Sequence, residues 1–404
     1  MMIFHRLCRC NVTVALCSAM LLPLASNAQI TEQQVILQGF ENSELKSQWQ
    51  AQLERARGEA QSAGRWSNPS LEFSQEDLNL PGGASEESNI WLRQDVDIAG
   101  VKSLQRKAAA KQLESAQIQQ QIAQQLWQKQ LREHFYTALA AQQKSAALKQ
   151  LLSHLAAIEK RVEQRVQRGD ASRFDALRIA KERALVVSQS ASEHAKFSDL
   201  SNQLFSLINE VPQPLVGTLL PSITVTDDSD FAGHPQLQAL QLQRQSAELQ
   251  ARAAARQRWP ELTLGVGHKR VNEPDFSADG RAISIGVTLP LFDNGGAEKR
   301  IAHSQVKHLN ADFIVAQKQL NVARQSALQR YRVNRDAAEK LQALTASPER
   351  SLGALAESSY QAGELNVMAL IDAYQSELEL AIQFIDTALE ARVAFIQLQF
   401  LRGQ

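Results

Sequence analysis

The chain is almost free of cysteine. Its three cysteines, Cys8, Cys10 and Cys17, all lie within residues 1–28, a segment with the composition of a secretory signal peptide. We expect this segment to be removed, which leaves a mature chain without cysteine and excludes a disulfide framework or a cysteine metal site. A lipid anchor on Cys17 is the alternative use of this segment, although Leu16 stands where lipoprotein processing favours a small residue.

The signal peptide is predicted from three features in a row. Arg6 and Arg9 give a basic start, Val12–Leu24 is apolar, and Ser26 and Ala28 are small residues at the positions that a signal peptidase requires. The apolar stretch is shorter than the roughly 20 residues of a transmembrane helix. A buried N-terminal helix is the competing interpretation.

Long apolar runs and an excess of basic residues are also missing. No apolar run is long enough for a transmembrane helix, so a membrane-spanning form of this exported chain requires strands. Lys and Arg together number 43 and equal the 43 Asp and Glu, and the net charge falls to about −2 once Arg6 and Arg9 are removed. This balance gives no basic footprint for nucleic acid, and we expect no nucleic-acid partner.

Proline and glycine are absent from about Val101 to Gln167, a stretch rich in Ala, Gln, Leu, Lys and Glu. This composition predicts a single helix of roughly 100 Å. A second long helix is predicted over 297–361, with a kink at Pro348. It carries a heptad seam, typical of helices that pack lengthwise, at Val306, Leu309, Phe313, Ala316, Leu320, Ala323 and Ala327. Rods of this length predict a bundle or a tube.

The chain repeats one order of elements. Residues 29–210 form the first predicted repeat and 233–404 the second, joined by a proline- and aspartate-containing linker over 211–232. Each repeat begins with a helix that ends at a tryptophan, Trp66 or Trp259. Two alternating segments, a long helix, a glycine turn and a returning helix follow.

The alternating segments predict four strands in total. They begin near Leu71 and Ile90 in the first repeat and near Leu262 and Ile283 in the second, and each places apolar residues on one face and polar residues on the other. Each is about 10 residues long, enough for a tilted strand to cross a bilayer. Four strands leave two open edges in lipid, where unpaired backbone groups are costly, so several protomers must close a barrel together. Two copies give 8 strands, and three give 12.

Three sequence motifs resemble those of a known protein family. They are Asn68–Leu71, Leu289–Gly296 and Tyr360–Asn366, in this order in a duplicated chain. The chain resembles the TolC family of outer-membrane factors, and particularly the branch that serves heavy-metal pumps of the cobalt–zinc–cadmium and copper/silver type. The resemblance implies a mostly helical fold with a small β part, a homotrimer with a 12-stranded β-barrel in the outer-membrane lipid, and a periplasmic α-helical barrel. The implied partners are a periplasmic adaptor (a membrane fusion protein) and an inner-membrane pump of the RND type.

Two predicted hairpin tips are the candidate functional sites. Gly169 and Gly363 suit the left-handed residue that ends a helix, while Ser172 and Asn366 suit the first cap of the returning helix. By resemblance these residues, with the neighbouring Arg168 of the first tip, dock into the adaptor. The second tip has Ala362 and Asn366 where the family commonly has Arg and Ser.

The resemblance also implies a gate at the periplasmic entrance, formed by Asp175, Tyr360 and Asp372. The alternative is that these aspartates are ordinary solvated helix residues near a positive helix end. At the opposite end, Trp66 and Trp259 precede strands in both repeats, which fits an aromatic belt at a membrane interface. Core packing of these two tryptophans is the competing interpretation.

No constellation of catalytic residues is present, and we expect no enzyme activity and no cofactor. The histidines, such as His134, His154, His268 and His303, lack the spacing of a metal site. The function predicted is the exit duct of a tripartite efflux system for heavy-metal cations, gated at the helix tips. A multidrug or type I protein secretion channel is the alternative within the family. A trimeric coiled-coil adhesin or scaffold is the alternative outside it.

Overall fold

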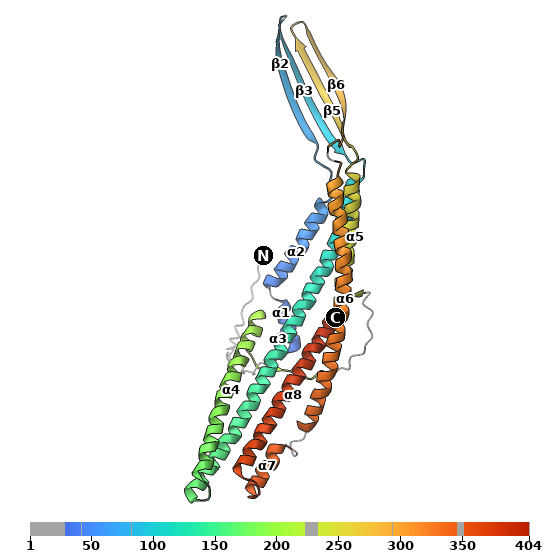
Figure 1. Ribbon diagram of the computed structural model, residues 1–404. Coiled ribbons are helices and arrows are strands. Elements are labelled where there is room, and N and C mark those ends of the chain that lie inside the picture. Colours follow the sequence, from blue (N-terminus) through green and yellow to red (C-terminus); the bar gives the residue numbers. More distant parts are fainter. Residues whose placement is uncertain are drawn as a thin grey trace, which may run out of the picture.

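The computed structural model describes residues 29–41, 43–81, 83–222, 233–292, 294–345 and 351–403. The expected signal peptide, Cys17, Pro348 and the second half of the expected linker lie outside these residues. The molecule is elongated, with a curved sheet at one end and a bundle of long helices that ends in two hairpin tips at the other (Figure 1). In the described parts of the chain, no helix combines the length and the apolar character needed to cross a membrane.

The four predicted strands form one antiparallel sheet. Its strands are β2 (Ser70–Leu80), β3 (Gly83–Val96), β5 (Glu261–Glu273) and β6 (Phe276–Thr288), and their order in the sheet is β2-β3-β5-β6. The hairpins of the two repeats are therefore joined side by side through β3 and β5. β2 and β6 are the edges, and each is paired on one side only.

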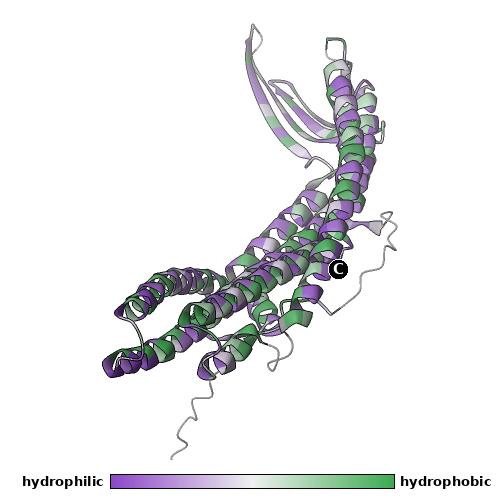
Figure 2. Ribbon diagram, turned by 60° about the horizontal axis from the view of Figure 1, so that its bottom comes forward, coloured by the Kyte–Doolittle hydropathy of each residue, from purple (hydrophilic) through white to green (hydrophobic). Residues whose placement is uncertain are grey.

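The register sorts the side chains of the sheet onto two faces. Residues that lie directly opposite each other point to the same side of a sheet. One face is apolar and exposed near the helical end, with Leu71 opposite Leu92, Val266 opposite Ile283 and Leu264 opposite Ile285. The other face is polar and carries Glu72, Trp91 and Arg93. Hydrophobic and hydrophilic residues alternate along these strands (Figure 2).

Long helices continue from the base of the sheet. α3 (Val101–Arg168) has 68 residues and confirms the predicted rod of roughly 100 Å. α4 (Arg173–Leu207) returns beside it, and the second repeat supplies α5 (Pro235–Arg256), α6 (Gly296–Thr345), α7 (Leu352–Gln361) and α8 (Val367–Leu401). In the first repeat, α1 (Glu32–Phe40) and α2 (Ser43–Ser62) precede the sheet.

The second long helix differs from the prediction. A continuous helix was expected over 297–361, but the structure has α6 ending at Thr345 and a separate α7 that begins at Leu352. Ser351 caps α7, because its Oγ accepts a hydrogen bond from the backbone N–H of Ala354 at 3.1 Å. Because Ser351 has extended backbone dihedrals (φ −60°, ψ 129°), α7 starts as a separate helix and does not continue α6.

The predicted heptad seam of α6 is confirmed. Leu309, Ala316, Leu320 and Ala327 are buried, and they face α8 and α5, which run along α6. Alanine at two of these four positions lets the helix backbones approach closely. The seam therefore holds α6 in the bundle by lengthwise packing.

The expected linker packs into the core over its described part. β4 (Leu215–Val216) pairs in parallel with β1 (Ile30–Thr31), which directly precedes α1, and Leu215 and Leu219 are buried. No sequence pattern predicts this pairing, because two-residue strands carry no periodicity.

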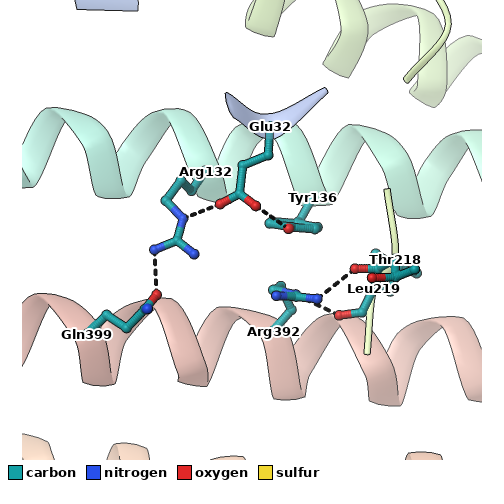
Figure 3. Close-up of polar contacts among 7 residues, drawn as sticks. All are labelled: Glu32, Arg132, Tyr136, Thr218, Leu219, Arg392 and Gln399. Carbon is teal, nitrogen blue, oxygen red and sulfur yellow. Dashed lines mark hydrogen bonds and ion pairs between the residues drawn. The ribbon is translucent and has the colours of Figure 1, made fainter. Parts of the chain in front are cut away.

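A buried arginine fixes the same segment (Figure 3). Arg392 of α8 donates hydrogen bonds of 2.7 Å to the carbonyl oxygens of Leu219 and Thr218, and its guanidinium lies 4.5 Å from the ring centroid of Tyr136. Burial lowers the pKa of Arg392 below the ordinary arginine value. Beside it, Glu32 accepts hydrogen bonds from both Arg132 and Tyr136. These contacts join the two ends of the chain to its middle.

Candidate functional site

The first tip joins α3 to α4 through Gly169. This glycine has a φ of 81°, a left-handed conformation that residues with a Cβ rarely adopt. The backbone N–H of Gly169 donates to Val166, and that of Asp170 donates to Arg165 at 2.8 Å, so the last carbonyls of α3 are satisfied. Ser172 then caps α4 by accepting a hydrogen bond of 3.1 Å from Asp175.

The second tip, between α7 and α8, repeats this construction. Gly363 has a φ of 80°, and the backbone N–H of Glu364 donates to Ser359 at 2.9 Å. Asn366 caps α8 by accepting a hydrogen bond of 2.9 Å from Ala369. The structure confirms the left-handed glycines and the caps predicted from the sequence in both tips.

Arg168 is a cation that the first tip presents to solvent, beside the exposed Arg173 at the start of α4. It is exposed at the last position of α3, and within the described residues it has no hydrogen-bond or ion-pair partner. The second tip presents Ala362 at the matching place. Of the two tips, only the first therefore offers a free guanidinium at the end of the rod.

The two expected gate aspartates have different surroundings. Asp175 is the third residue of α4, and its Oδ2 accepts a hydrogen bond of 2.7 Å from the hydroxyl of its own cap, Ser172. Asp372 is exposed on α8, where it lines a groove of about 450 Å³ between α7 and α8. Among the described residues no contact joins these two aspartates within one protomer.

Tyr360, the third expected gate residue, links the two tips. It is buried among the helices at this end, and its hydroxyl accepts a hydrogen bond of 3.4 Å from Arg165 of α3. The same guanidinium lies 5.9 Å from the centroid of the tyrosine ring. Tyr360 therefore ties the end of α7 to the end of α3.

Glu357 is a residue of this region that sequence reasoning missed. It accepts hydrogen bonds from Tyr374 of α8 at 2.6 Å, from Gln361 at 3.1 Å and from Arg161 of α3. Burial of Glu357 raises its pKa, but the hydrogen bonds from Tyr374 and Arg161 outweigh that effect and leave the pKa below its usual range. Glu357 and Arg161 are 196 residues apart, and no local pattern connects them.

The two tryptophans at the other end lie at the base of the sheet. Trp66 is 54% exposed and Trp259 is 56% exposed, each between the end of a helix and the start of a strand. The Nζ of Lys102 lies 5.5 Å from the ring centroid of Trp66. Trp259 lines a pocket of about 280 Å³ at the same level. The exposure of both rings argues against core packing.

The described parts of the chain contain no group of three or more His, Cys, Asp or Glu side chains arranged to hold a metal ion. Two histidines of the described residues contact a single carboxylate each. His268 of β5 lies beside Asp279 of β6, and His308 lies beside Asp312 on α6.

Part of the chain is similar to a known protein family. Residues 231–404 match the outer membrane efflux protein family. This match covers the second repeat, including β5, β6 and the second tip. No curated protein sequence matches the chain.

Solved structures show a likeness in fold over almost the whole chain. The outer membrane protein VceC from Vibrio cholerae has 18% identity and a TM-score of 0.75, over 92% of this chain and 96% of its own. CusC, described for its transmembrane channel formation, has 15% identity and a TM-score of 0.77, over 92% of each chain. The CmeC outer membrane channel of Campylobacter jejuni has 15% identity and a TM-score of 0.74, over 98% of this chain and 94% of its own. The predicted mostly helical fold with a small β part is thus confirmed.

Proposed function

We propose that this chain is one protomer of a trimeric outer-membrane channel that serves as the exit duct of a tripartite efflux system. The observation that supports this most is the four-stranded sheet, with an exposed apolar face and two unpaired edges, from which α3, a rod of roughly 100 Å, and α6, of roughly 75 Å, continue. An apolar face of this kind is stable against lipid tails. Its edges are stable in lipid only when they are paired.

Closure by several copies supplies the missing pairs. β6 of one protomer pairs with β2 of the next, and three copies give a barrel of 12 strands. Two copies would give 8 strands, whose interior is filled by its own side chains, whereas a larger barrel holds a channel. The helices that leave the same sheet extend this barrel as a helical tunnel into the periplasm.

The helix tips form the inner end of the duct. The exposed Arg168 and the paired caps of the two tips form the surface that docks a periplasmic adaptor, which in turn joins an inner-membrane pump of the RND type. The three copies of Asp175, Tyr360 and Asp372 form the gate. The exposed Trp66 and Trp259 lie at the membrane interface, where amphipathic rings are favoured.

The cargo proposed is heavy-metal cations, and the support for it is the resemblance of the sequence motifs to the heavy-metal branch. A passive duct of this kind needs no cofactor and performs no catalysis. A multidrug or type I secretion channel is the alternative, since the tunnel is shared machinery. A trimeric adhesin is disfavoured, because the strands lie in two internal hairpins rather than at the end of the chain.

Mass measurement and channel recording test the channel itself. The mature protein purified in detergent should have the mass of a trimer, and it should conduct ions in a planar bilayer. A stable monomer in detergent would contradict the closed barrel. A deletion strain that loses metal resistance but keeps drug resistance would support the heavy-metal cargo, and the opposite profile would support the multidrug alternative.

A further inference from the structure

The apolar face of the sheet changes character part-way along its strands. On β3 this face is apolar from Val96 to Ile90 apart from Gln94, about 20 Å of strand at roughly 3.3 Å per residue. On β5 and β6 the apolar positions end one pair earlier, at Val266 and Ile283. The next positions on these two strands are polar: His268 lies opposite Ile90 and Arg281, and Arg270 lies opposite Asp279.

The two arginines of this face are free cations. Both are exposed, and in the described part of the chain neither has an ion-pair or hydrogen-bond partner. Asp279, the carboxylate nearest in the register, has its Oδ2 3.9 Å from Nε2 of His268 instead. The acidic residues further out on this face, Asp77 and Glu86, lie on β2 and β3, where both accept hydrogen bonds from Gln75.

Basic side chains on the polar face of the same sheet, in contrast, form ion pairs within the protomer. Arg93 forms an ion pair with Glu72, and Lys269 forms one with Glu87. Lys269 is the direct neighbour of Arg270 in β5 but points to the opposite side. The sheet therefore neutralises the cations of one face within the protomer and leaves two cations of the other face without a counterion.

We propose that Arg270 and Arg281 bind the phosphate groups of an outer-leaflet lipid, an inference that rests on the proposed function because it requires the apolar face to lie in the membrane. Arg281 follows the last apolar residue of β6 on this face, Ile283, and Arg270 lies two face positions beyond Val266 of β5, so both arginines lie where the apolar positions of these strands end. A guanidinium matches a phosphate with two parallel hydrogen bonds. Two such groups on adjacent strands fit a doubly phosphorylated headgroup.

The proposed trimer offers a second possible partner for these arginines, namely a neighbouring protomer. β6 is an edge strand, so closure of the barrel brings β2 of a neighbouring protomer beside it, with Asp77 on that strand. Ion pairs across this seam would satisfy the arginines without lipid. The experiment therefore separates lipid binding from protomer association.

Equilibrium binding of bisphosphorylated lipid A to the detergent-solubilised, delipidated mature protein tests the proposal. The site variant is Arg270→Gln with Arg281→Gln. One control variant is Arg178→Gln with Lys181→Gln, which removes two exposed charges from α4. A second is Lys269→Gln, which removes the adjacent cation on the opposite face. Dephosphorylated lipid A and inorganic phosphate are the comparison ligands.

We expect the site variant to bind bisphosphorylated lipid A roughly 30-fold more weakly than the wild type, from about 1 kcal/mol for each basic residue near a charged lipid. Both controls should bind it within about threefold of the wild type, and dephosphorylated lipid A should bind wild type and site variant alike. Unchanged binding in the site variant would overturn the proposal. Equally strong binding of inorganic phosphate would assign the site to free anions and would overturn the lipid assignment.

Two further readouts keep the outcomes distinct. If the delipidated site variant loses its trimer mass while both controls retain it, the arginines serve the seam between protomers and the lipid proposal is overturned. Ion conductance of the same preparations tests the channel independently. A conducting wild type with no phosphate-dependent lipid binding would overturn this inference alone, whereas a non-conducting monomer would count against the proposed function.

Discussion

At the scale of single residues, the tips owe their shape to two glycines and their caps. Gly169 and Gly363 turn the chain with a positive φ, and Ser172 and Asn366 restart it with a side-chain cap. These four residues act locally, which is why the sequence alone predicted their conformations. Arg168 has no hydrogen-bond or ion-pair partner among the described residues, so its guanidinium is available to a binding partner.

Charge reversal at Arg168 tests the docking proposal. Arg168→Glu should weaken adaptor binding at least roughly tenfold, because a like-charge contact in a docking surface is costly, while the trimer remains in the membrane. Gly169→Pro should have a larger effect, because proline cannot adopt a φ of 81°. Adaptor cross-linking and resistance of the host strain measure both, with Lys181→Glu on α4 as the control. Normal cross-linking in both tip variants would remove the tip from the docking surface.

Replacement of Asp175 and Asp372 by Asn tests the gate. Three carboxylates close to a three-fold axis repel, and a pair at about 4 Å would interact by roughly 4 kcal/mol at an effective dielectric near 20. The wild-type channel should be cation-selective and blocked by divalent cations from the periplasmic side, and the double variant should lose much of both. Planar-bilayer recordings compare the two proteins. Identical selectivity and block would assign both aspartates to ordinary helix positions.

Glu357 gives a pH-dependent prediction. Its pKa is lowered in the folded state, so its stabilising contribution is complete above the unfolded pKa of about 4.3 and is lost as the pH falls through the lowered value. Glu357→Gln should therefore lower the free energy of unfolding by about 1 kcal/mol at pH 7, with the difference shrinking below about pH 4. Thermal unfolding of the wild type and Glu357→Gln at pH 7 and below about pH 4 measures the difference in stability. A difference that stays constant with pH would mean that the carboxylate charge contributes nothing.

At the scale of elements, the break between α6 and α7 divides the second rod into two parts with different attachments. α6 packs by its heptad seam along α8, and α7 is tied to α3 and α8 through Glu357 and Tyr360. The first rod, α3, has no such break. The two tips of one protomer therefore differ in how they are held, even though their turns are built alike.

The seam itself predicts a large effect of truncation. Leu320 is 6% exposed in the cluster formed by α5, α6 and α8. Leu320→Ala should lower the free energy of unfolding by about 2–5 kcal/mol, from lost burial and the cavity that remains. Gln325→Ala, an exposed position of the same helix, should change it by less than about 0.5 kcal/mol. Denaturant unfolding measures the free energy of unfolding of both variants. Equal losses in Leu320→Ala and Gln325→Ala would mean that the seam is not a packing contact in solution.

At the scale of the whole molecule, helices make up most of the chain, and the strands are the proposed membrane element. The far-ultraviolet circular dichroism of the purified protein should be mainly helical, because α3, α4, α6 and α8 alone supply most of the described residues. A spectrum dominated by strand would contradict the rods. The elongated arrangement also separates the two proposed contacts, lipid at the sheet and adaptor at the tips, by the full length of the helices (Figure 1).

The sequence by itself determined the elements that rest on local physics. The absence of Pro and Gly between Val101 and Gln167 predicted α3, period-two alternation predicted the four strands, and the heptad of α6 predicted its packing face, because each is a property of neighbouring residues. The positions of the two tips followed from glycine and cap chemistry.

Only the tertiary structure decided the contacts between residues far apart in the chain. The joining of β3 to β5, the insertion of Leu215–Val216 beside Ile30–Thr31, the burial of Arg392 and the network around Glu357 involve partners separated by long stretches of chain. The strand register also decided that Arg270 and Arg281 share the apolar side with no counterion. Such pairings depend on how whole elements pack, and no periodicity within one element encodes them.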